Sequence, residues 1–169
     1  MNKDILVSGI IDTYNYQDQL KNLVLQNDSI IILGNGGSSG IASHICQDYT
    51  KVLKKRSFTI SDASRLTCYT NDYGYDKAYL KFLQEFVDID KKLLLILISS
   101  SGNSNNIIEC ANWAKDYTNI SIVTLTGFDA NNKLKTMNIP NRKINYWWNS
   151  NSYGIVECVH MIFLHNIMV

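Results

Sequence analysis

Two short segments of the chain are rich in residues that bind anions. Gly34–Gly40 reads Gly-Asn-Gly-Gly-Ser-Ser-Gly, and Ser99–Ser104 reads Ser-Ser-Ser-Gly-Asn-Ser. Glycine lets the backbone take positive φ values and approach a ligand closely. Hydroxyl groups and the free N–H groups of a helix N-terminus can hold a phosphate dianion without a cation. Together the two segments predict a site for the phosphate group of a small molecule.

Each segment also has an alternative interpretation. Ser and Asn are favoured at helix N-caps, so Ser99–Ser104 is compatible with a simple cap, although a cap needs only one such residue. Gly34–Gly40 lacks the Gly-Lys-Ser/Thr of a Walker loop, and Ser39 stands where the dinucleotide fingerprint has its third glycine. Asp62, near the end of the next expected strand, keeps a dinucleotide site open as the weaker interpretation. We expect no nucleotide cofactor.

The two segments are expected to follow strands and to begin helices. Ser29–Leu33 and Leu93–Ile98 are short apolar runs typical of buried strands, and the second is the more hydrophobic, which favours the centre of a sheet. Further strands are expected at Phe58–Ile60, Ser121–Leu125 and, as an edge strand, Lys143–Asn145. Helices are expected within Asp4–Gln26 with an interruption near Tyr14–Tyr16, and at Gly40–Val52, Tyr75–Val87, Ser104–Tyr117 and Tyr153–Met168. This alternation predicts one α/β domain whose parallel sheet binds ligands at the carboxyl ends of its strands.

The composition argues against several other classes of protein. Apolar residues make up 46% of the chain, charged residues 18%, and the net charge is +1, which gives no electrostatic reason to expect nucleic acid. The longest apolar run, Leu93–Ile98, is far shorter than the about 20 residues of a membrane-spanning helix, and no export signal is recognisable. The four cysteines lack Cys-x-x-Cys spacing and are expected to be free thiols packed among apolar neighbours. We expect a cytoplasmic protein without a membrane partner.

Four motifs in one order relate the chain to a known family. They are Gly34–Ser38 (Gly-Asn-Gly-Gly-Ser), Asn71–Gly74 (Asn-Asp-Tyr-Gly), Ser99–Ser104 and Thr124–Gly127 (Thr-Leu-Thr-Gly). Together they closely resemble the sedoheptulose-7-phosphate isomerases (phosphoheptose isomerases) of the sugar-isomerase (SIS) domain group, over roughly residues 29–168. The resemblance implies an SIS-type three-layer αβα domain with a five-stranded, flavodoxin-like parallel sheet. Residues 1–28 would be an N-terminal helical segment of the same domain and residues 29–169 the SIS domain, in a homo-oligomer, either dimer or tetramer.

The resemblance also implies roles for individual residues. The phosphate-binding positions are Ser99, Ser101 and Ser104, and the other substrate-binding positions are Asn35, Gly36, Gly37, Asn71, Asp72, Ser100 and Glu157. The catalytic positions are Asp48, as the general base, and His165, as the group that moves protons between substrate oxygens. The positions of the metal ligands, which bind zinc in some members, are His44, Asp48, Glu157 and His165.

The spacing of these residues is compatible with a shared site. His44 and Asp48 are four residues apart on one expected helix, so their side chains lie on one face. Glu157 and His165 are eight apart, within about 80° of each other around the last helix. Two of these residues differ from the family pattern: Asp48 replaces a glutamate and Glu157 replaces a glutamine. The alternative is that His44 and His165 are ordinary helix histidines.

The resemblance implies an aldose–ketose isomerase that converts sedoheptulose 7-phosphate into D-glycero-D-manno-heptose 7-phosphate through an enediol, for lipopolysaccharide or capsule synthesis. The departures at Asp48 and Glu157 keep an alternative open, a non-catalytic sugar-phosphate-binding or protein-interaction regulator with the same fold. Another SIS enzyme, such as an amino-sugar isomerase, is a third interpretation. Trp147 and Trp148 have no counterpart in the family pattern and are assigned either to a sugar-binding face or to a subunit interface.

Overall fold

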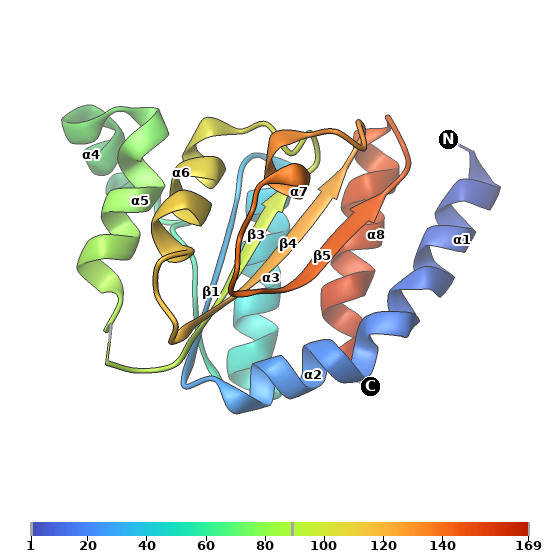
Figure 1. Ribbon diagram of the computed structural model, residues 1–169, viewed down its shortest axis with the longest axis horizontal. Helices are drawn as coiled ribbons and strands as arrows, with labels where there is room; N and C mark the ends of the chain where they lie inside the picture. The colour runs from blue at the N-terminus through green and yellow to red at the C-terminus, as the bar shows by residue number, and fades with distance from the viewer. Residues whose placement is uncertain (1, 89, 169) are drawn as a thin grey trace.

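Five parallel strands form the central layer of the computed structural model, which describes residues 2–88 and 90–168 (Figure 1). The strands are β1 (Ser29–Gly34), β2 (Arg56–Phe58), β3 (Leu93–Ser99), β4 (Ile120–Gly127) and β5 (Arg142–Trp148). Their order in the sheet is β2-β1-β3-β4-β5, so β3 lies in the middle. Strand β2 is added on one side of β1, and β3, β4 and β5 follow in turn on its other side. This is the flavodoxin-like order expected from the sequence, and the central position of Leu93–Ile98 is confirmed.

Helices cover both faces of this sheet. One face carries α1 (Lys3–Thr13), α2 (Gln17–Gln26), α3 (Gly37–Lys51) and α8 (Tyr153–His165), with the short 3-10 helices Tyr14–Tyr16 and Asn166–Met168 joined to them. The other face carries α4 (Ala63–Tyr73), α5 (Tyr75–Phe86), α6 (Asn105–Ala114) and α7 (Lys133–Thr136). The three-layer αβα architecture is therefore confirmed.

The residues of β3 show why its sequence is an unbroken apolar run. Leu94, Ile96 and Ile98 pack into the core under α3 and α8. The alternate residues, from Leu93 to Leu97, pack into the second core under α5 and α6. Because successive side chains of a strand point to opposite faces, a strand with a core on each side needs apolar residues at every position.

Several boundaries differ from the expected ones. Helix α3 begins at Gly37 instead of Gly40, because the turn is tighter than the expected one and Gly36 already serves as the N-cap. The second strand is Arg56–Phe58, since its length is set by pairing with Ser29–Ile31 of β1 and not by its own apolar residues. Helix α4 was not expected; it has no buried residue, so its sequence lacks a clear apolar stripe.

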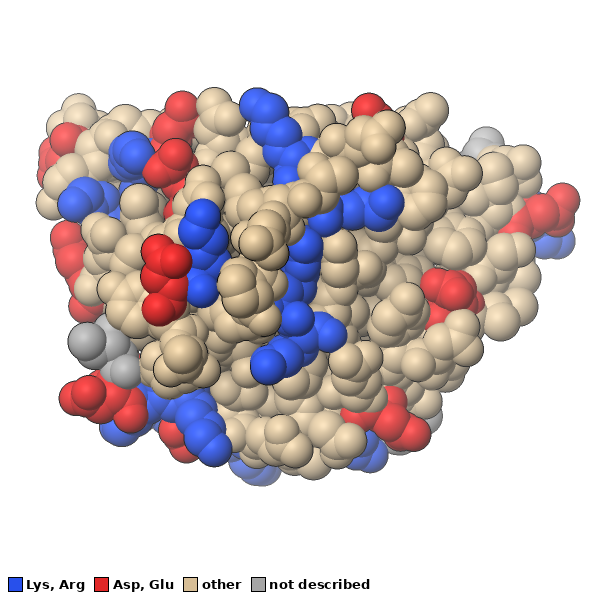
Figure 2. Space-filling view, in the orientation of Figure 1, with Lys and Arg blue, Asp and Glu red and all other residues tan. Residues whose placement is uncertain are grey.

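Two further observations concern the surface. Cys46 and Cys110 are buried as expected, but Cys68 and Cys158 are exposed, so the prediction that the thiols are packed is wrong for these two. None of the helices in the described part of the chain is long and apolar enough to cross a membrane. Lys and Arg side chains form a band over the middle of the face shown in Figure 2, the side on which α7 and β5 lie in Figure 1.

His160 of α8 is fully buried beneath the end of β4. Its Nε2 lies 3.1 Å from the Thr126 carbonyl oxygen, which can only accept, so Nε2 carries the proton. Its Nδ1 atom is buried without a hydrogen-bond partner. Burial lowers the pKa of His160 to about 4, because a charged imidazolium has neither water nor a second acceptor there.

We expect acid to destabilise the fold through His160. Between its lowered pKa of about 4 and the ordinary value of 6.5, the unfolded chain binds a proton that the folded chain does not. Stability from this group is therefore complete above pH 6.5 and falls as the pH is lowered towards 4, by about 2 kcal/mol at pH 5. Urea unfolding at pH 7.5 and pH 5 measures the loss. The variant His160→Gln should lose less, and an equal loss in both proteins would contradict the assignment.

Candidate functional site

A pocket of about 250 Å³ lies at the carboxyl ends of β1 and β3. Its lining comprises Asn35, Gly36, Gly37, Ser38, Ile98, Ser99, Ser100, Ser101, Ser104, Tyr153 and Glu157. The structure thus brings the glycine-rich segment and the serine segment together around one space, as the sequence predicts for a parallel sheet. It also adds Ser38 and Tyr153, which were not among the predicted site residues.

The serine segment has more hydroxyl groups than its helix uses. Ser104 is the N-cap of α6, yet its side chain makes no capping hydrogen bond and instead accepts one from the Ser99 hydroxyl at 3.2 Å. The hydroxyl of Ser100 is buried and has no partner. A segment that served only as a cap would use its N-cap hydroxyl on the helix. The unused hydroxyls therefore favour a ligand over the simple-cap interpretation.

The glycine segment brings a helix N-terminus to the same pocket. Gly36 has φ +55° and ψ −124°, a conformation that residues with a side chain rarely adopt. Gly37 is the first residue of α3, and a Cβ there would collide with the Glu157 carboxylate. The N-termini of α3 and α6 both lie at the pocket, and their dipoles favour an anion.

Glu157 sets the electrostatic character of the pocket. It is the acidic residue among the lining residues, and these include no Lys or Arg. A carboxylate here opposes an anionic ligand, whereas the two helix N-termini and the hydroxyl groups attract it. An anion in this pocket would therefore be held by neutral donors alone.

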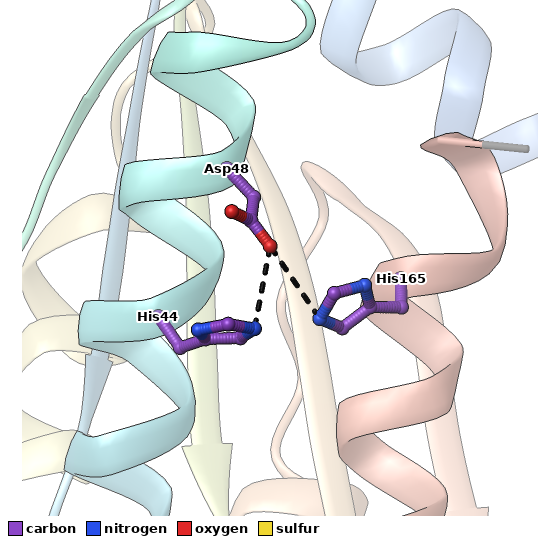
Figure 3. A group of neighbouring side chains, drawn as sticks. All are labelled: His44, Asp48 and His165. Atoms are coloured by element: carbon purple, nitrogen blue, oxygen red, sulfur yellow. Dashed lines mark ion pairs between the residues drawn. The ribbon is translucent and has the colours of Figure 1, made fainter.

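A second group of functional side chains lies farther along α3 and α8 (Figure 3). Asp48 Oδ2 is 3.3 Å from His44 Nε2 and 3.7 Å from His165 Nε2. One ligand atom from each residue lies within 4.8 Å of the others, so the three can coordinate one divalent cation. Two imidazole nitrogens and a carboxylate oxygen are a donor set that suits zinc.

The predicted fourth ligand, Glu157, is not part of this cluster. It precedes His165 by eight residues, which places it about 12 Å away along the axis of α8. Its carboxylate lies against Gly37 at the phosphate pocket instead. The assignment of Glu157 as a metal ligand therefore remains a prediction.

A buried hydrogen bond fixes the two helices that carry the cluster. The Tyr49 hydroxyl donates to the Leu164 carbonyl oxygen at 2.8 Å, and both side chains are fully buried. Tyr49 directly follows Asp48, and Leu164 directly precedes His165. The bond therefore holds α3 against α8 at the level where the carboxylate meets the imidazole.

Asn71 and Asp72 do not line the pocket. They are exposed residues in the last turn of α4, where the Asn71 amide donates to the Asp72 carboxylate at 3.0 Å. Figure 1 shows α4 at the opposite end of the molecule from α1, outside α5. Within one chain, the structure does not bring this predicted pair together with the other substrate-binding residues.

The two tryptophans have different surroundings. Trp147 donates through Nε1 to the Phe128 carbonyl oxygen at 3.3 Å, and Lys135 Nζ lies 4.7 Å from its ring centre. Trp148 is partly buried and packs against the core beneath α1, close to Gly9. Neither residue lines the pocket.

Comparison with known proteins agrees with this geometry. The family model described as SIS domain matches residues 17–127. A phosphoheptose isomerase of Fusobacterium nucleatum is 30% identical over 93% of this chain and 79% of its own length. One of Cytophaga hutchinsonii is 35% identical over 66% of this chain, and the match spans only 60% of that relative.

Solved structures show the same fold. A phosphoheptose isomerase from Francisella tularensis superposes with a TM-score of 0.80 at 21% identity, covering 96% of this chain and 90% of its own. One from Neisseria gonorrhoeae superposes with a TM-score of 0.75 at 24% identity, covering 98% of this chain and 86% of its own.

Removal of the Tyr49 hydroxyl should disturb the cluster as well as the fold. We expect Tyr49→Phe to lower the free energy of unfolding by about 1 kcal/mol and to weaken zinc binding, because α3 and α8 lose their shared hydrogen bond. Tyr79→Phe is the matched control, since the Tyr79 hydroxyl donates to the Gly34 carbonyl oxygen at 2.8 Å on the other face of the sheet. Unfolding and zinc titrations measure both effects. Equal zinc affinities in the two variants would contradict the prediction.

Neutralising Glu157 should strengthen anion binding. We expect Glu157→Gln to bind inorganic phosphate about fivefold more tightly, because a like charge worth roughly 1 kcal/mol is removed from the pocket. Isothermal titration calorimetry at pH 7.5 measures the dissociation constant. Glu85→Gln, which makes the same charge change on α5, should leave the constant unchanged. Unchanged or weaker binding in Glu157→Gln would show that the carboxylate does not oppose the anion.

Proposed function

The chain belongs to the SIS domain family, in its phosphoheptose isomerase group, and we propose that it converts sedoheptulose 7-phosphate into D-glycero-D-manno-heptose 7-phosphate. The observation that supports the proposal is that α3 and α8 both contribute residues to the pocket and to the cluster of His44, Asp48 and His165. Helix α3 begins at the phosphate pocket and places His44 about 10 Å farther along its axis. Helix α8 runs beside it from the pocket residue Glu157 to His165. A sugar phosphate anchored at the pocket can therefore extend its carbon chain towards the cluster.

The residues of this chain supply the groups that an enediol mechanism needs. The phosphate is held by the hydroxyls of the serine segment and the N–H groups at the start of α3 and α6. Asp48 is the base that removes a proton from C1 of the ketose to give the enediol, and the protonated Asp48 then delivers a proton to C2 as the aldose forms. His165, on the other side of the Asp48 carboxylate, moves the proton between the two oxygens.

The cluster also fits a divalent cation. His44, Asp48 and His165 would hold it, and zinc in this position would polarise the substrate oxygens. Asp48 contacts both histidines through Oδ2, and its other oxygen, Oδ1, takes part in neither contact. One carboxylate oxygen is thus available for proton transfer while the other faces the histidines. The departures at Asp48 and Glu157 are the support for the non-catalytic alternative, and the similarity to phosphoheptose isomerases favours the enzyme over it.

We further propose a cytoplasmic homo-oligomer, dimer or tetramer. Val7, Ile11 and Tyr14 of the N-terminal helices are 44%, 65% and 53% exposed, and such apolar residues support self-association. In an assembly, the exposed Asn71 and Asp72 would be available to the pocket of a neighbouring subunit. Residues 1–28 would then be the helical segment through which the SIS domain, residues 29–169, associates.

Proton exchange tests the reaction directly. Sedoheptulose 7-phosphate is incubated with the protein in deuterium oxide, with and without zinc, and the product is analysed by NMR. We expect deuterium at C2 of the aldose product. If neither exchange nor product is found, both with zinc and without it, the proposed activity is refuted.

Two substitutions should separate the chemistry from the binding. We expect Asp48→Asn to lower kcat at least about 100-fold while the affinity for sedoheptulose 7-phosphate stays within about twofold, because the phosphate contacts lie elsewhere. Ser101→Ala should weaken that affinity about tenfold with a smaller effect on kcat. Steady-state kinetics and calorimetry measure the two quantities. If both variants lost affinity and turnover to the same extent, the division of roles would be wrong.

A further inference from the structure

A pair of asparagine side chains joins the two phosphate-binding segments. Asn35 Nδ2 donates to Asn106 Oδ1 at 2.9 Å, and Asn106 Nδ2 donates back to Asn35 Oδ1 at 2.9 Å. Asn35 follows β1 and lines the pocket. Asn106 lies in the first turn of α6, is 1% exposed and does not line the pocket. Nothing in the family motifs given above assigns a role to Asn106.

A backbone group sets the direction of both amides. The Ile107 N–H lies 3.0 Å from Asn106 Oδ1, and it also points to the Ser104 carbonyl oxygen at 3.1 Å. An N–H group can only donate, so the oxygen of the Asn106 amide must face Ile107. The Asn106 nitrogen is then turned towards Asn35 and requires an oxygen there. The Asn35 amide is thereby fixed with its oxygen towards Asn106 Nδ2.

The Asn35 oxygen has a second partner. The Tyr75 hydroxyl, at the start of α5, lies 2.9 Å from Asn35 Oδ1 and must donate to it. A carbonyl oxygen has two lone pairs, and both are now used. The Asn35 nitrogen gives one of its two hydrogens to Asn106, which leaves one N–H hydrogen without a partner in these contacts.

We propose that Asn106 is a positioning residue that fixes the Asn35 amide so that Asn35 can only donate a hydrogen bond to the ligand. Asn35 would then contact a phosphate oxygen or another acceptor oxygen of the sugar phosphate, and it would not accept from a sugar hydroxyl. The inference rests on the proposed function for its ligand. Its geometric basis, the orientation of the pair, holds in the free protein.

A double-mutant cycle tests whether Asn106 acts through Asn35. Sedoheptulose 7-phosphate is titrated calorimetrically into the wild type, Asn35→Ala, Asn106→Asp and the double variant. The substitution Asn106→Asp keeps the shape but places an acceptor oxygen against Asn35 Oδ1. We expect Asn106→Asp to weaken binding about tenfold, and the double variant to bind no more weakly than Asn35→Ala. Losses that multiply in the double variant, or wild-type affinity in Asn106→Asp, would overturn the proposal.

A matched variant controls for the added charge. Asn105→Asp introduces the same negative charge one residue earlier in α6, where the side chain is exposed and contacts Asp76 and not Asn35. Its affinity should stay within about twofold of the wild type. A tenfold loss in Asn105→Asp would show that charge alone explains Asn106→Asp, and the proposal would fail.

Side-chain amide hydrogen exchange in the free wild-type protein tests the geometry without a variant or a ligand. One Nδ2 hydrogen of Asn35 should exchange slowly because it is bonded to Asn106, and the other should exchange rapidly. Rapid exchange of both hydrogens would overturn the proposal, even if Asn106→Asp fails to fold. If sedoheptulose 7-phosphate does not bind the wild type, the proposed function fails, whereas the exchange result still decides whether the Asn35 and Asn106 amides are paired.

Discussion

The packing of α3 against α8 is the constraint on which the functional arrangement depends. These two helices carry the cluster of His44, Asp48 and His165, and each also reaches the anion pocket. The bond between the Tyr49 hydroxyl and the Leu164 carbonyl oxygen fixes their relative position from within the core. The geometry of the cluster is thus set by a contact buried in the core. A change in this contact would move the three side chains of the cluster without altering any of them chemically.

The pocket at the carboxyl ends of β1 and β3 offers an anion neutral donors and no cationic side chain. Glu157 contributes a negative side chain, and the lining of the pocket contains no Lys or Arg. Attraction must therefore come from the N-termini of α3 and α6 and from hydroxyls that the fold leaves unused, such as that of Ser100. Neutral donors attract other anions from solution only weakly, so under the proposed function shape and hydrogen-bond number would determine which phosphate ester is retained.

The sequence predicted what depends on local pattern and missed what depends on distance. The run Leu93–Ile98 identified the central strand because a core on both faces demands apolar residues throughout. Helix α4 escaped prediction because none of its residues is buried. Asn35 and Asn106 are 71 residues apart, so their pairing has no local signature. The contact between the Glu157 carboxylate and Gly37 joins residues 120 positions apart, so it has no local signature either.

The two outer strands differ from the central three in how they meet solvent. Strand β2 is only three residues long, and β5 carries Arg142 and Lys143 and is flanked by α7. The Arg142 guanidinium donates hydrogen bonds to the carbonyl oxygens of Leu134 and Met137, which holds the α7 segment against this edge of the sheet. Short or cationic margins are poor templates for a strand from another molecule. The two edges of the sheet should therefore resist amyloid-like stacking, which leaves the helical surfaces for the proposed self-association.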